Sequence, residues 1–149
     1  MGLFDAIDVA GSALSAERLR MDVTAENLAN AQTTRTANGQ PYRRKVVELQ
    51  QAPKGGSFGA VLTGAMGPGG DSGPSGVRVA GIAQDSTPNR LVYDPGHPDA
   101  NAQGYVSMPN VDPVSEMVDL ITESRGYEAN VTAMQSAKTM FSKTLDLLR

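Results

Sequence analysis

Large apolar side chains recur at helical spacing over the first thirty residues. From about residue 2 to residue 30 they advance in steps of four and three, which is a heptad-like register. One seam position is large and apolar throughout: Ile7, Leu14, Met21 and Leu28. The other becomes polar along the chain: Leu3, Ala10, Glu17 and Thr24. The pattern therefore predicts a helix that makes contact along one narrow line.

A second, longer helix is predicted from Pro113 to the C-terminus. Asp112 is a suitable N-cap, and proline suits the first helical turn. The predicted helix is about 50 Å long, well beyond the average for a globular protein. Its stripe also steps by three and four, interrupted at Ser124 and Lys138. The apolar seam consists of Met117, Leu120, Tyr127, Val131, Met134, Phe141, Leu145 and Leu148, widened at its start by Val114, Val118 and Ile121.

The region between the helices has a different pattern. Asn38-Gly39 is a strong turn signal, and four short strand-like segments follow: "RRKVVEL", "VRVAGIA", "RLVY" and "YVSM". Val77 and Val79 alternate with small or polar residues, which is typical of a strand with one buried face. Between the first two segments, residues 55–76 are so rich in glycine that we predict a flexible loop.

These elements predict an α+β fold built from two units. Residues 1–30 and 112–149 form a terminal helical unit, and residues 31–111 form an irregular, β-rich middle region that includes the 55–76 loop. The chain has 16 glycines, 9 prolines and no tryptophan, so a single large core is not expected. Two lone helices bury too little apolar surface to offset the entropy of ordering them. We therefore expect other chains to cover part of their surface.

Composition excludes several classes of function. The net charge of −3 gives no reason to expect a nucleic-acid partner. The absence of cysteine removes disulfides and thiolate chemistry. No apolar run is long enough for membrane insertion. Asp5 and Asp8 stand where a secretory signal would carry positive charge, so no cleaved signal peptide is predicted.

Candidate chemistry is sparse. The only histidine, His97, lies between Asp94 and Asp99 in "DPGHPD", which a metal hydrolase could use, but these residues are also turn formers. Asp119 and Glu123 lie one helical turn apart, and a solvated face is the favoured interpretation of that pair. We predict no catalytic, cofactor-binding or metal site, no cofactor, and no enzymatic activity.

Gly126 lies inside the second helix, where glycine costs up to about 1 kcal/mol relative to alanine. Two interpretations remain open for this residue. Either the small residue lets a neighbouring helix approach closely, or it is merely tolerated.

Three segments resemble one family. "AENLANAQTT" after an N-terminal heptad helix resembles the signature of the axial proteins of the bacterial flagellum, which include rod, hook and hook-adapter subunits. "ESRGYEANVTAMQSAKTMFSKTLDLL" resembles the matching C-terminal helix. The segment from Gln84 to Ile121 resembles the proximal rod members of that family. The glycine-rich segment is longer than the family pattern leads us to expect.

The resemblance implies a structural subunit of the proximal rod, which transmits torque for motility. It implies that the terminal helices pair as an antiparallel coiled coil and polymerise in the rod. The implied partners are copies of the chain, other proximal and distal rod proteins, FliE and the flagellar export apparatus. The implied location is the basal body in the periplasmic space, reached by type III export without a cleaved signal. Another axial subunit, or a soluble helical adaptor, is the alternative.

The stretch "ENLANAQTT" connects the first helix to the middle region. We expect Asn27 and Asn30 to satisfy backbone groups at this joint, while Leu28 continues the seam and small Ala29 permits crowding by another subunit. The seam residues of both helices are the predicted subunit interface.

Overall fold

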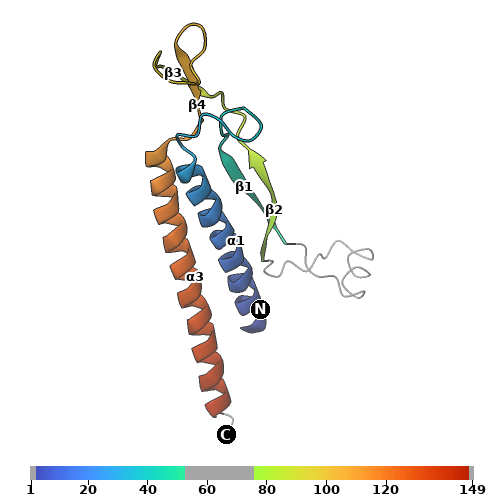
Figure 1. Cartoon of the computed structure of the whole chain (residues 1–149). Coiled ribbons are helices and arrows are strands. Elements are labelled where there is room, and N and C mark those ends of the chain that lie inside the picture. Colours follow the sequence, from blue (N-terminus) through green and yellow to red (C-terminus); the bar gives the residue numbers. More distant parts are fainter. Residues whose placement is uncertain (1–2, 53–75, 148–149) are drawn as a thin grey trace, which may run out of the picture.

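The computed structural model describes residues 3–52 and 76–147 and has an α+β architecture. Helix α1 spans Leu3–Ala29 and helix α3 spans Pro113–Leu147, which are 27 and 35 residues long. The two helices lie side by side and run in opposite directions, and α3 extends beyond the N-terminal end of α1 (Figure 1). Both helices therefore appear where the heptad pattern predicts them.

The ends of the helices follow local chemistry. Asp112 caps α3, because its carboxylate accepts hydrogen bonds from the Val114 amide at 3.2 Å and the Ser115 hydroxyl at 2.8 Å. These bonds hold the pKa of Asp112 below its ordinary value. The predicted N-cap of α3 at Asp112 is thus confirmed. Helix α1 ends in a turn in which the backbone amide of Asn30 donates a hydrogen bond to the Glu26 carbonyl.

Within the described residues, four short strands form two antiparallel hairpins. β1 (Lys45–Gln51) pairs with β2 (Val77–Gln84), and the register shifts between Glu48 and Leu49. β3 (Arg90–Tyr93) pairs with β4 (Tyr105–Met108). The strands match the four predicted segments within a few residues. The predicted glycine-rich loop lies outside the described residues, apart from Gly76.

The first hairpin packs against α1, and the second lies beyond the paired end of the helices (Figure 1). Exposure alternates along β2, so that Val77 and Val79 are half-buried on the same face as predicted. Gly104 precedes β4 with a positive φ of 81°, a conformation that side chains rarely adopt. The β1–β2 sheet therefore rests on α1 through one of its faces.

The hydrophobic core is small, as the composition predicts. Its buried apolar residues are mostly alanines and valines: Ala10, Ala16, Val23, Ala31, Tyr42, Val106, Val111 and Ala137. Glu116 and Asn27 are among the largest fully buried side chains. The interior where the helices meet the middle region is therefore polar, and its hydrogen bonds determine how these parts fit together.

Candidate assembly site

Asn27 is the centre of the joint between α1, α3 and the first hairpin. It is 1% exposed. Its amide group donates to the Lys45 carbonyl at 2.9 Å and to Glu116 Oε2 at 3.1 Å. Its Oδ1 atom accepts from the Lys45 amide and the Tyr42 hydroxyl, both at 2.9 Å. All four hydrogen bonds available to an asparagine side chain are therefore made inside the chain.

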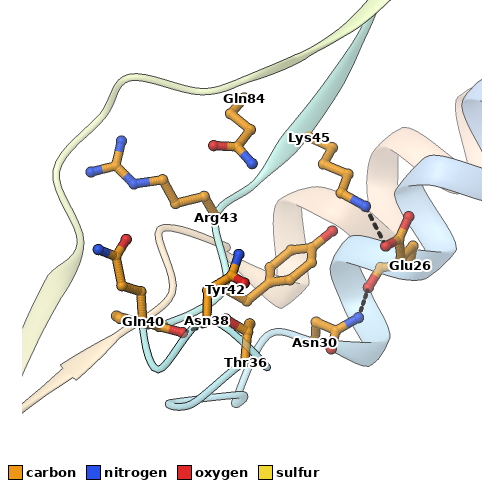
Figure 2. Close-up of a pocket in the computed structure, with 10 residues that line it drawn as sticks. Glu26, Asn30, Thr36, Asn38, Gln40, Tyr42, Arg43, Lys45 and Gln84 are labelled. Atoms are coloured by element: carbon orange, nitrogen blue, oxygen red, sulfur yellow. Dashed lines mark hydrogen bonds and ion pairs between the residues drawn. The ribbon is translucent and has the colours of Figure 1, made fainter.

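Tyr42 lines a polar pocket of about 400 Å³ together with Glu26, Lys45 and Gln84 (Figure 2). The Lys45 ammonium lies 5.8 Å from the centre of the tyrosine ring and pairs with Glu26 at 2.5 Å. Burial, together with the negative charges of Glu26 and Glu116, raises the pKa of Tyr42 to about 12. The tyrosine hydroxyl therefore stays protonated over the whole physiological pH range and donates a hydrogen bond to Asn27.

Arg44 connects the start of β1 to α3. Its Nε donates to the buried Glu116 carboxylate at 2.5 Å, and its NH2 group to Asp119 at 3.2 Å. It also lies 4.0 Å from Asp85. The hydrogen bond to Glu116 raises the pKa of Arg44. A buried carboxylate is tolerated at position 116 because a cation and Asn27 both bind it.

Glu123 forms a second polar layer one heptad further along α3. It is 5% exposed, accepts a hydrogen bond from the Thr24 hydroxyl at 3.2 Å, and lies 3.5 Å from the Arg20 Nε. Burial raises the pKa of Glu123. Asp119 is partly exposed and paired with Arg44. The interpretation of Asp119 and Glu123 as a solvated face was therefore wrong for Glu123, which lies between the helices.

The other joint residues have different surroundings. The Asn30 side chain donates to the Glu26 carbonyl at 2.9 Å, and its Oδ1 accepts from the Thr33 hydroxyl at 3.1 Å. Leu28 is half-buried and Ala29 is exposed. Asn30 therefore acts locally at the end of α1, whereas Asn27 connects three elements.

The predicted seam residues of α1 are only partly buried by the rest of the chain. Its side chains at Ile7, Leu14, Met21 and Leu28 are all half-buried, and that of Leu3 lies outside the described residues. Two residues of the other seam position of α1 are buried more deeply: Ala10 is 8% exposed and Thr24 is 7% exposed. Small and polar residues let α3 lie close to α1 at this position, while the large residues are left at the edge of the contact.

The predicted seam of α3 divides in the same way. Leu120, Tyr127, Val131 and Met134 are half-buried, whereas Met117, Phe141 and Leu145 are exposed. Leu148 lies outside the described residues. The deeply buried positions of α3 are instead Glu116, Glu123 and Ala137.

Tyr42, Arg44 and Glu116 were not among the predicted joint residues. One signal was available: Glu116 and Glu123 are seven residues apart and therefore occupy the same side of a helix. Arg44 gave no comparable signal, because its partners lie 72 and 75 positions away in the chain.

A large part of α3 presents apolar side chains to solvent. Near its start, Val114 is 64% exposed and Val118 is 57% exposed. Val114, Met117, Val118 and Ile121 are exposed at positions i, i+3, i+4 and i+7 near the start of α3, and we call these four residues the outer face. Met140, Phe141 and Leu145 are exposed toward the other end of the helix. Outer-face residues of this size are a sign of a protein contact surface.

The residues considered as a possible metal site form turns; they are Asp94, His97 and Asp99. Asp94 accepts a hydrogen bond from the Gly96 amide at 3.1 Å, and the His97 Nδ1 accepts one from the Asp99 amide at 3.1 Å. Asp99 binds the Thr34 hydroxyl at 2.8 Å. Within residues 3–52 and 76–147, no three acidic or histidine side chains group as a metal ion would require. No helix in this part of the chain could cross a membrane.

A pair of long antiparallel helices with an exposed apolar face is typical of a subunit that packs against other chains. Two families of known proteins match segments of this chain. Residues 7–35 match the family described as "Flagella basal body rod protein", and residues 102–147 match "Flagellar basal body rod FlgEFG protein C-terminal".

Relatives narrow the class further. The chain is 52% identical to the flagellar basal-body rod protein FlgC of Bacillus subtilis, over 99% of both chains. It is 44% identical to FlgC of Borreliella burgdorferi, over 100% of this chain and 99% of that one, and 44% identical to FlgC of Salmonella typhimurium, over 99% and 98%. The chain therefore belongs to the FlgC family of flagellar basal-body rod proteins. It is a structural subunit of the flagellar rod and not an enzyme.

Proposed function

We propose that the chain polymerises through its terminal helices into the proximal rod and transmits torque there. The single observation that carries this mechanism is the outer face of α3, where Val114, Val118 and Ile121 are all more than half exposed. Burying apolar side chains contributes roughly 1.5–3 kcal/mol each. Neighbouring subunits, either copies of the chain or other proximal and distal rod proteins, supply this burial in the assembled rod.

The terminal helices act as an antiparallel coiled coil within each subunit. Residues 1–30 and 112–149 form this unit, and residues 31–111 form the middle unit. The half-buried seam residues support this arrangement, because they complete the edges of the α1–α3 contact and remain accessible to a neighbour. A second layer of contacts between subunits then covers the seams from outside.

Torque transmission requires a joint that resists bending. Asn27 links α1 to the backbone of Lys45 and to Glu116 of α3, and Arg44 links β1 to α3. Every polar side-chain atom of Asn27 and Glu116 is hydrogen-bonded in this arrangement, and any change of it leaves a buried group without a partner. The hydrogen bonds of the joint therefore fix the angle between the helix pair and the first hairpin. The torque is distributed over many contacts between subunits.

The structure also bears on how the subunit would be exported. We propose that the flagellar export apparatus carries the chain to the periplasmic space, where it meets FliE and the other rod proteins. The small core supports easy unfolding for passage. Helix α1 stays with the mature subunit, because it supplies Asn27 and Thr24 to the joint and cannot be removed as a signal without dismantling it.

Hydrogen exchange on the purified chain tests the proposal. Alone, the half-exposed ends of α1 and α3 should exchange quickly. Mixing with other rod proteins should protect both helices strongly and give polymers visible by electron microscopy. Full protection of the lone chain, or a small complex of fixed size on mixing, would instead indicate a soluble helical adaptor.

A further inference from the structure

The outer face of α3 points away from α1. Glu116 and Glu123 mark the side of α3 that faces α1, because both side chains are buried and bind residues of α1. Val114 and Val118 are each two residues from Glu116. Ile121 is likewise two residues from Glu123. Two residues turn a helix by about 200°, so the outer face lies on the side of α3 opposite to α1.

A second surface lies on α1, near the end of the helix that joins the middle region. It consists of four residues at positions i, i+4, i+7 and i+8, which we call the receiving face: Met21, Ala25, Leu28 and Ala29. The two alanines are exposed, and Met21 and Leu28 are half-buried. Large outer-face side chains can therefore pack over the alanines, as large and small residues interlock between packed helices.

The receiving face is turned away from the other elements that pack on α1. Ala29 is two residues beyond Asn27, which binds α3, so Ala29 points away from α3. Ser12 accepts a hydrogen bond from the Val77 amide of β2 at 3.0 Å. Met21 is nine residues beyond Ser12, and nine residues make about two and a half helical turns. Met21 therefore lies on the side of α1 opposite to the first hairpin.

Charged residues accompany both surfaces. Arg18 and Asp22 lie beside the receiving face on α1, and Arg125 and Glu128 continue the line of the outer face along α3. All four side chains are exposed. Within residues 3–52 and 76–147, none of them forms an ion pair. Each surface thus offers one cation and one carboxylate to a partner.

The order of these charges selects one orientation of two helices that meet through the surfaces. Along α1, Arg18 precedes Asp22, and along α3, Arg125 precedes Glu128. In a parallel arrangement the two arginines would face each other, as would the two carboxylates, which is unfavourable. Only an antiparallel arrangement places opposite charges together. The α3 of a neighbouring copy would then run in the same direction as the chain's own α3, which is also antiparallel to α1 (Figure 1).

The same charges set the height of the neighbour along α1. Within the chain, Thr24 of α1 binds Glu123 of α3. Asp22 is two residues before Thr24, and Arg125 is two residues beyond Glu123. A neighbour paired through Asp22 and Arg125 therefore keeps the register of the α1–α3 contact within the chain, and its α3 lies level with the chain's own α3.

We propose that the outer face of one copy of the chain packs on the receiving face of a second copy, with Arg125 beside Asp22 and Glu128 beside Arg18. The proposal rests on the proposed function and names the two surfaces that meet. Because these surfaces differ, each copy can use both at once, and such a contact repeats into a ring or a helical filament. Each α3 then lies between two α1 helices, its own and that of its neighbour.

Charge exchange tests the contact and the identity of the partner. Asp22→Arg, Arg125→Asp and the double variant are expressed at full length in a strain that lacks its own copy of the gene. Glu48→Arg, at an exposed position of β1, is the matched control. The amount of each variant in isolated basal bodies is measured by quantitative mass spectrometry, and the thermal unfolding of each purified chain is recorded.

Each single reversal should lower incorporation at least about tenfold, because it places two like charges together. The double variant should return to within about threefold of the wild-type amount, since it restores an opposite pair between copies. Glu48→Arg should match the wild type, and all the purified chains should unfold at the same temperature. A double variant that enters no better than the single ones would show that the outer face meets a different rod protein, and would overturn the proposal.

Cross-linking tests the register. The chain contains no cysteine, so a pair of introduced cysteines reports the contact directly. In the proposed arrangement Ile121 of one copy lies opposite Ala25 of the next, and the variant Ala25→Cys/Ile121→Cys should form disulfide-linked oligomers in oxidised basal bodies. Gln103→Cys in place of Ile121→Cys should form none.

Absence of oligomers from basal bodies that contain the Ala25→Cys/Ile121→Cys variant would overturn the inference while leaving the rod assignment intact. Absence of the wild-type chain from basal bodies would overturn the proposed function itself.

Discussion

At the scale of single residues, the joint depends on asparagine and glutamate side chains that connect distant parts of the chain. Asn27 satisfies two backbone groups of Lys45 and two side chains, those of Tyr42 and Glu116. No aliphatic residue of similar size could replace these bonds. The buried polar groups would then lack partners, and each such loss costs about 1–3 kcal/mol.

Replacing Asn27 with alanine should therefore destabilise the chain by about 3 kcal/mol or more. Asn30→Ala is the matched control, because Asn30 is part-exposed and acts only within its own turn. We expect that control to cost about 1 kcal/mol or less. Urea unfolding followed by circular dichroism measures both. Similar losses for the two variants would show that Asn27 has no role beyond the end of the helix.

Glu123 should make the stability of the lone chain depend on pH in a definite direction. Burial raises the pKa of its carboxyl, so the folded chain holds the proton at pH values where the unfolded chain has released it. The contribution is present below the ordinary glutamate pKa and is lost as pH rises through the raised one. Glu123→Gln should remove this dependence and raise the free energy of unfolding at pH 7 by about 1 kcal/mol.

Glu128→Gln, at an exposed position of α3, is the matched control that isolates this effect. Other carboxylates act in the opposite direction: hydrogen bonds lower the pKa of Asp85 and Asp112, so their stabilisation is lost as pH falls. Those groups are present in both variants and cancel in the difference. Unfolding curves recorded from pH 4 to pH 8 give the result, and parallel curves for the two variants would contradict the prediction.

At the scale of elements, α3 is a long helix with one residue of poor helical propensity. A methyl group added at Gly126 would lie 3.6 Å from the nearest atom of Glu17, which is an ordinary contact distance. Within this chain, therefore, no close approach of α1 requires glycine at this position. The tolerated-residue interpretation fits the contact between α1 and α3.

Gly126→Ala should raise the free energy of unfolding by about 0.5–1 kcal/mol, since alanine favours a helix over glycine. Gly104→Ala should act in the opposite direction. Its φ of 81° is unfavourable for alanine, and the added carbon would lie 2.9 Å from Tyr93. Thermal unfolding of the two variants is the measurement. A destabilised Gly126→Ala monomer would mean that α1 lies closer to α3 in solution.

At the scale of the whole molecule, α3 exposes a face that nothing else in the described part of the chain covers. The antiparallel arrangement places α1 on one side of α3 and leaves Val114, Val118 and Ile121 on another. On the proposed function, the large apolar side chains of the outer face are buried only when neighbouring subunits cover them, whereas the joint forms within the chain. Stability and assembly are therefore separable by mutation.

Val118→Asp should leave the fold of the lone chain intact and prevent its incorporation into the rod. Val118 is 57% exposed, so a charge there stays in water in the monomer but would be buried in a subunit contact. Gln103→Asp, in the exposed turn before β4, introduces the same charge away from the outer face. Swimming motility and the content of isolated basal bodies should fall for Val118→Asp and stay near wild type for Gln103→Asp. Full motility of Val118→Asp would exclude this face from the rod contacts.

The sequence by itself determined the helices, the strand segments and the N-cap at Asp112, because periodicity, turn residues and capping act over a few neighbouring positions. It also determined the family, through three segments whose residues resemble those of rod proteins. The tertiary structure decided which side of each helix is buried. The large seam residues are half-buried or exposed, whereas Thr24, Glu116 and Glu123 are buried.

The physical reason is that burial depends on partners far away in the chain. Glu116 is buried because Arg44 and Asn27 reach it from 72 and 89 positions away, and hydrophobic periodicity contains no information about such pairs. A charged residue in a helical pattern predicts a solvated face unless its partner is known. Only the fold brings that partner to it, and the polar joint therefore could not be predicted from the sequence pattern.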